Sequence, residues 1–73
     1  MPRYRFVAQL TPEQVLAYYR GHARSVLVIT ELGVRVQLDL LHFQPYFTHQ
    51  GLDGNFELTT DANGRFLSLD KII

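Results

Sequence analysis

The sequence predicts a small α+β domain in which one helix covers a mainly antiparallel sheet of five strands. Three observations support this fold class: several segments alternate apolar and polar residues with a period of two, two segments are apolar on both faces, and a single segment has the start and stop signals of a helix. The order of elements is strand, helix, two strands, a short helical turn and two more strands, and 73 residues leave room for one domain, residues 1–73. The strands are expected at residues 3–10, 25–30, 34–38, 55–60 and 65–72.

The first strand is expected at residues 3–10, where apolar and polar side chains alternate. A period of two places every second residue on one face of a strand. The face expected to be buried carries Tyr4, Phe6, Ala8 and Leu10.

The helix is expected at residues 11–20, because both of its ends carry recognisable signals. Thr11 is a suitable N-cap, Pro12 suits the first helical position, and Gln14 completes a capping-box pattern. Gly21 can adopt the left-handed conformation that ends many helices. One stripe of the helix is expected to pack on the sheet, with Tyr18 at its flank: Val15, Leu16 and Tyr19.

The segment from Ser25 to Thr30 is apolar on both faces and rich in β-branched residues, which is typical of a central strand covered on two sides. One short helix provides little material to cover the second face. Either Leu27 and Ile29, or the alternating valines, are therefore expected to face a partner chain.

The next segment is expected to return as the second strand of a hairpin over residues 25–38, after a tight turn at 31–33. Asp39 can cap a single helical turn, and Pro45 limits its length. A dense apolar group is expected to close one end of the core: Leu40, Leu41, Phe43, Tyr46 and Phe47.

The last third of the chain is expected to contain a loop and a second hairpin. The glycines and polar residues of 48–54 predict the loop. The strand 55–60 then alternates, the sequence of residues 61–64 predicts a turn because Asn and Gly tolerate left-handed geometry, and residues 65–72 form the return strand.

Composition limits the setting of the protein. There is no cysteine, so disulfides and thiolate metal sites are excluded. The N-terminus lacks the pattern of a signal peptide, and the longest apolar run, 26–29, is too short to span a bilayer. The expected setting is soluble and cytoplasmic, without a membrane partner.

The formal net charge is zero, but the charges are divided unevenly along the chain. Residues 1–37 contain five arginines and two glutamates, or +3, whereas residues 38–73 contain two basic and five acidic residues, or −3. Strand pairing can interleave these charges as ion pairs. Alternatively, the charge asymmetry can help copies of the chain, or a partner, to associate.

Three segments together resemble a family of small bacterial proteins known only as a domain of unknown function. These segments are LTPEQVLAYYRGHARSVLV, FQPYFTHQGLDGNFEL and DANGRFLSLDKI, and the resemblance covers nearly the whole chain. It implies a short bacterial protein that stands alone. It implies no activity and assigns no functional residue.

A candidate binding surface combines the polar joint after the helix with the loop at 48–54. Arginines can contact phosphates and exposed aromatic rings can stack on bases, so the alternative function is binding of nucleic acid or a phospholigand. A near-neutral isoelectric point argues against that alternative, because nucleic-acid-binding domains usually carry a strong basic excess. Arg3, Arg5, Arg35 and Tyr46 could extend the patch. The candidate residues are Arg20, His22, Arg24, Tyr18, His49 and Asp53.

Metal binding and catalysis have weak support in the sequence. His22, His42 and His49 could bind a metal with Asp39 or Asp53, but their spacing matches no ligand motif. The pair His49 and Asp53 is the only local acid–base combination, and such pairs usually stabilise a loop. No metal, cofactor or catalytic activity is therefore expected.

The leading hypothesis is a non-catalytic protein-interaction module that forms a homodimer or another homo-oligomer. It depends on the small size of the domain and on the two-faced apolar strand at residues 25–30.

Overall fold

The computed structural model describes residues 1–72 and confirms the α+β fold class. It contains five strands, one α-helix and one 3₁₀-helix, η1, and every strand pair is antiparallel. Residues 1–72 contain no helix that is long and apolar enough to cross a membrane. The elements are β1 Arg3–Leu10, α1 Pro12–Tyr19, β2 Ser25–Ile29, β3 Arg35–Asp39, η1 Leu40–Tyr46, β4 Leu52–Thr60 and β5 Phe66–Lys71.

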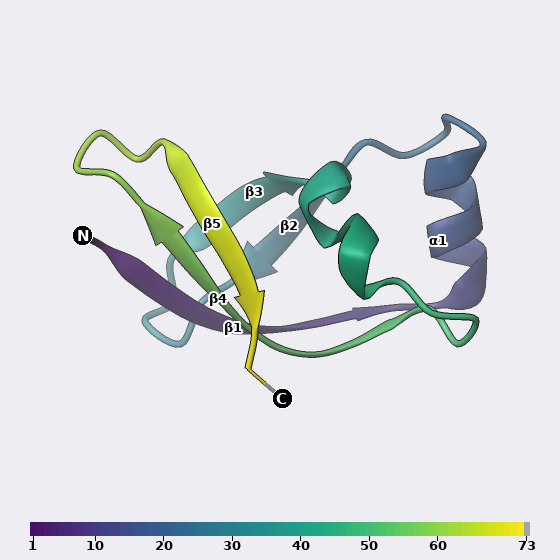
Figure 1. Ribbon diagram of the computed structural model, residues 1–73, viewed down its shortest axis with the longest axis horizontal. Coiled ribbons are helices and arrows are strands. Elements are labelled where there is room, and N and C mark those ends of the chain that lie inside the picture. The colour runs from purple at the N-terminus through teal and green to yellow at the C-terminus, as the bar shows by residue number, and fades with distance from the viewer. Residues whose placement is uncertain (73) are drawn as a thin grey trace.

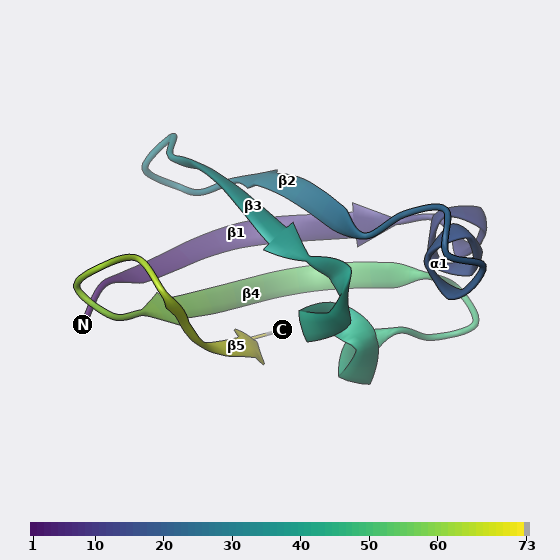
Figure 2. The same cartoon turned by 90° about the horizontal axis from the view of Figure 1, so that it is seen from above.

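The five strands are divided between two sheets instead of forming one. A three-stranded sheet has the order β1-β4-β5, and β2 and β3 form a separate hairpin. Figures 1 and 2 show β1 and β4 side by side, with the hairpin β2–β3 on the β1 side and η1 on the β5 side. The expected central position of residues 25–30 is therefore wrong: β2 has one neighbouring strand, not two.

The helix α1 has the ends that the sequence predicts. The backbone N–H of Gln14 donates to Thr11 Oγ1 at 3.2 Å, and the N–H of Thr11 donates to Gln14 Oε1 at 2.8 Å, which completes the capping box. At the other end Gly21 has a φ of 79°. The N–H of His22 donates to the Ala17 carbonyl at 2.8 Å, as in a Schellman motif.

The expected apolar stripe of α1 is only partly correct. Val15 is buried, but Leu16 and Tyr19 are exposed, and the half-buried Tyr18 packs against the core instead. The reason is the position of the helix. It stands at one end of β1 and β4 and does not lie across the sheet, so only part of its apolar surface meets the core (Figure 1).

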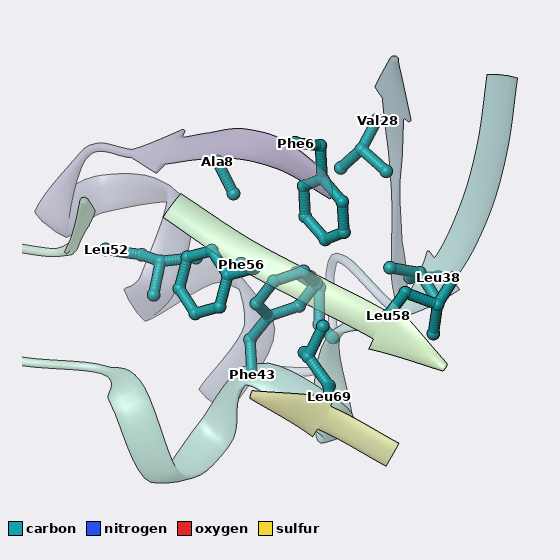
Figure 3. Packing of buried hydrophobic residues seen from close by; sticks show 10 residues of the cluster. Phe6, Ala8, Val28, Leu38, Phe43, Leu52, Phe56, Leu58 and Leu69 are labelled. Carbon is teal, nitrogen blue, oxygen red and sulfur yellow. The ribbon is translucent and has the colours of Figure 1, made fainter. Parts of the chain in front are cut away.

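The core gathers around Phe56 of β4. Phe56 and Phe43 have no exposed surface, and their rings meet edge to face with centroids 5.3 Å apart. Phe6 stacks on Phe56 at 5.9 Å. Figure 3 shows these rings and the aliphatic side chains of both sheets converging on one centre, so the two sheets share a core. The predicted inward face of β1 is confirmed, since Phe6 and Ala8 are buried.

The segment after β3 largely follows the prediction. The carboxylate of Asp39 accepts from the N–H of Leu41 at 3.1 Å and caps η1. This helix runs through Pro45, which is further than the expected single turn. Leu41 does not join the apolar group that closes the core, because its side chain is 56% exposed.

The predicted loop at 48–54 is too long, because β4 begins at Leu52. Gly51 has a φ of 100°, and a Cβ at this position would collide with the carbonyl oxygen of Leu10. The close approach of these backbones lets Leu52 pair with Leu10, so three expected loop residues extend the strand. The turn at 61–64 is confirmed, with Asp61 accepting from the N–H of Asn63 at 2.8 Å.

Candidate functional site

The residues of the predicted binding surface come from several elements of the fold. Arg20 caps the C-terminus of α1, and His22 and Arg24 follow in the exposed segment that leads to β2. Asp53 lies on β4, where it accepts a hydrogen bond from Gln9 Nε2 at 3.2 Å. That contact ties Asp53 to β1, and within residues 1–72 no hydrogen bond joins Asp53 to His49.

Tyr18 and His49 do lie at one aromatic cluster. The rings of Tyr18, Tyr19 and Phe47 meet edge to face, with centroid separations of 5.1 to 6.1 Å. The Tyr18 hydroxyl donates to Gln44 Oε1 at 3.3 Å. His49 is exposed at the tip of the turn 48–51, and it lines a cavity of about 420 Å³ with Tyr19 and Phe47.

The arginines expected to extend a basic patch lie elsewhere. Arg3 and Arg5 are near the start of β1, an eight-residue strand whose other end leads into α1. At about 3.3 Å per residue, some 23 Å separates the two ends. Arg35 begins β3, next to the hairpin turn. The basic residues are therefore divided between the two ends of the molecule.

Strand pairing interleaves the opposite charges at one position. Arg5 Nε lies 3.1 Å from Glu57 Oε2, and the two residues are direct partners in the β1–β4 register. Within residues 1–72 no other salt bridge is found. No group of three or more His, Cys, Asp or Glu side chains in this range could hold a metal ion.

A different feature stands out on the β1–β2 side of the molecule. Three apolar side chains are largely exposed there: Val7 at 60%, Leu27 at 57% and Ile29 at 60%. All three line a groove of about 290 Å³ between β1 and β2. We call these three side chains the apolar rim. The sequence indicated an uncovered face on residues 25–30. It did not indicate Val7, because no pattern within residues 3–10 or 25–30 shows that β1 lies next to β2.

The family model described as "Protein of unknown function (DUF2835)" matches residues 2–72, and the chain belongs to this family. This confirms the resemblance found in the sequence. No curated protein and no solved structure shows a significant match to the chain.

Proposed function

We propose that this member of the DUF2835 family is a non-catalytic protein-interaction module that self-associates through its apolar rim. The observation that supports the proposal is the exposure of Val7, Leu27 and Ile29 around one groove. Single exposed apolar side chains are normal on a protein surface, but a group of them on one side is typical of an interaction site.

The size of the rim limits the strength of the contact. A standard protein interface buries about 800 Å² per partner, and three side chains cover much less. Self-association should therefore be weak and should appear at high micromolar concentration. The rim contains no charged side chain, so two copies can meet there without repulsion between like charges.

Size-exclusion chromatography with light scattering tests the proposal. The mass should rise towards that of a dimer between low and high micromolar protein, and Leu27→Glu should abolish the rise by placing a charge in the contact. Leu41→Glu is the matched control, because Leu41 is 56% exposed but lies on η1, away from the rim. A wild-type protein that stays monomeric throughout contradicts self-association.

The aromatic cluster supports a second candidate function, binding of single-stranded nucleic acid. Tyr19 is 57% exposed beside Phe47, and it is followed directly by Arg20 and the segment to Arg24. Bases can stack on such rings while arginines contact phosphates. Fluorescence titration with single-stranded RNA and DNA at low salt tests it, since phosphate contacts must weaken steeply with salt. Tyr19→Ala should weaken any binding, and no binding at low salt excludes this function.

A further inference from the structure

The hairpin β2–β3 has a free edge, which lies on β3. The N–H of Thr30 donates to the Val34 carbonyl at 2.9 Å, in the same register as the β2–β3 pairs. Residues i and i+2 of a strand direct their backbone N–H and C=O groups to the same side, so even-numbered residues of β3 face β2. The backbone groups of Arg35, Gln37 and Asp39 therefore point away from β2.

No other strand covers this edge. Within residues 1–72 β3 pairs with β2 alone, and the N–H groups of Arg35, Gln37 and Asp39 form no hydrogen bond with another strand. Figure 1 shows β3 above β2, and in Figure 2, which is seen from above, no helix or strand lies in front of β3. The edge is therefore open to another molecule.

The other outer strands face elements of the same chain. The N–H of Glu31 donates to the Arg5 carbonyl at 2.8 Å, which is the first rung of a ladder between β1 and the end of β2. The Tyr46 hydroxyl donates to the Leu69 carbonyl at 2.8 Å, so η1 covers part of the β5 edge. An edge with free N–H and C=O groups is a template for pairing with another chain. The edge of β3 is the place where such pairing can begin.

The side chains along this edge carry one positive and one negative charge. Arg35 and Asp39 are both exposed and lie on the same face of β3. They are four residues apart, or about 13 Å along the strand, so they cannot pair with each other. In the part of the chain that the structure describes, neither has a salt-bridge partner. The Asp39 carboxylate accepts from the N–H of Leu41 through Oδ1, which leaves Oδ2 for a second donor.

Antiparallel pairing of β3 with β3 of a second copy matches these charges. When Gln37 of one copy lies opposite Gln37 of the other, Arg35 of each copy lies opposite Asp39 of its partner. Opposite charges at directly opposed positions stabilise a strand pair. Registers that place Arg35 opposite Arg35, or Asp39 opposite Asp39, bring like charges together and are disfavoured. The charges on the edge therefore select one register.

We infer that the free edge of β3 is a self-association surface, at which two copies of the chain pair antiparallel around Gln37. A two-fold axis relates the copies, so the same edge serves both partners. The two hairpins then form one four-stranded sheet in the order β2-β3-β3-β2, with backbone hydrogen bonds across the new pair. On the core side, Val36 of each copy lies opposite Leu38 of its partner, which covers more of the half-buried Val36.

This contact goes beyond the proposed role of the apolar rim, because it uses a different surface. The rim lies on β1 and β2, whereas the new pair forms along β3. A strand edge of five residues is much smaller than a standard interface, and the cost of association offsets most of its hydrogen bonds. Pairing should therefore need about millimolar protein, above the micromolar range in which the rim contact is tested.

Sedimentation equilibrium of the full chain at about 0.1–3 mM tests the inference. The parent variant is Val7→Glu, which places a charge in the apolar rim but lies on β1, away from β3. It should show a monomer–dimer equilibrium. Adding Arg35→Asp should raise the dissociation constant about tenfold or more, because two attractive charge pairs become repulsive. Adding Arg35→Lys instead should change the constant by less than about threefold, because the charge is kept.

A mixture of two charge variants provides the sharpest comparison. Chains with Arg35→Asp have two negative edge charges and chains with Asp39→Arg have two positive ones, so each variant repels its own copies and complements the other. The mixture should associate like the parent, whereas each variant alone should not. Arg3→Asp and Asp70→Arg are the matched controls, because they make the same changes of charge at exposed positions of β1 and β5. Each control should associate like the parent.

Amide hydrogen exchange identifies the surface that pairs. As the concentration rises, the amides of Arg35 and Gln37 should exchange more slowly, whereas those of the turn 61–64 should keep their rates. The same measurement on the wild type keeps the test valid if a variant does not fold. A Val7→Glu protein that stays monomeric at about 3 mM, equal association with and without Arg35→Asp, or unchanged exchange at Gln37 overturns the inference. The rim is tested separately at micromolar concentration, so either proposal can fail alone.

Discussion

The substitution Gly51→Ala should destabilise the fold far more than the same change at Gly64. Both glycines have positive φ, 100° and 83°, so a Cβ strains the backbone at both positions by about 1–2 kcal/mol. They differ in their surroundings. A Cβ on Gly51 would collide with the Leu10 carbonyl oxygen, whereas a Cβ on Gly64 has nothing within 4 Å.

The collision sets the size of the difference. Forcing an extra carbon into a packed site destabilises by about 1–3 kcal/mol, and here the contact is backbone, which cannot move aside as a side chain can. The reduced freedom of the unfolded chain affects both variants equally and cancels. Gly51→Ala should therefore be about 1–3 kcal/mol less stable than Gly64→Ala, out of a total of about 4–11 kcal/mol for a domain of 73 residues.

Urea denaturation followed by far-ultraviolet circular dichroism measures this difference. With a slope near 1 kcal/mol per molar urea, the midpoint of Gly51→Ala should lie about 1–3 M below that of Gly64→Ala. Equal midpoints would refute the reasoning, because they would show that the β1–β4 pair does not depend on the close approach at Gly51.

Three further contacts give smaller expected effects. Thr11→Ala removes the N-cap of α1 and should lower the free energy of unfolding by about 1 kcal/mol, measured by urea titration; no change would show that the capping box is not needed. Tyr46→Phe removes the hydrogen bond to the Leu69 carbonyl and should lower the free energy of unfolding by about 1 kcal/mol in the same measurement. An unchanged free energy would show that water takes the place of the hydroxyl. A double-mutant cycle on Arg5 and Glu57 should give a coupling of about 0.2–1 kcal/mol that decreases with added salt, since the arginine side chain is 60% exposed; a coupling independent of salt would contradict a surface ion pair.

The parts of the fold that depend on neighbours in sequence could be predicted. The ends of α1 follow from Thr11, Gln14 and Gly21, which act within a few residues. The inward face of β1 follows from its alternation, and the turn at 61–64 follows from its Asn and Gly residues. In each case the chemistry that decides the conformation lies within the segment itself.

The predictions that were wrong concern features that depend on contacts between residues distant in the sequence. Residues 52–54 look like a loop, but pairing with the end of β1 makes them a strand. Tyr18 and not Tyr19 packs on the core because α1 stands at the end of the sheet, and no pattern within the helix encodes that position. The surroundings of the candidate residues also depend on distant contacts: Asp53 accepts a hydrogen bond from Gln9 of β1, whereas residues 20–24 follow α1.

The long connection between β1 and β2 explains two features of the fold. It explains why the strands form two sheets, and why a groove lies between β1 and β2. A hairpin loop of two to five residues would let β1 and β2 pair along their full length. Here residues 11–24 intervene and contain the capped helix α1, so the ladder opens after one rung. The opening leaves the core closed, because Phe6 and Val28 still pack beneath it. The open edges face solvent, where water can bond to their N–H and C=O groups. Replacing a hydrogen bond within the protein by one to water changes the free energy of unfolding by only about 0.5–1.5 kcal/mol. An open ladder is therefore compatible with a stable domain.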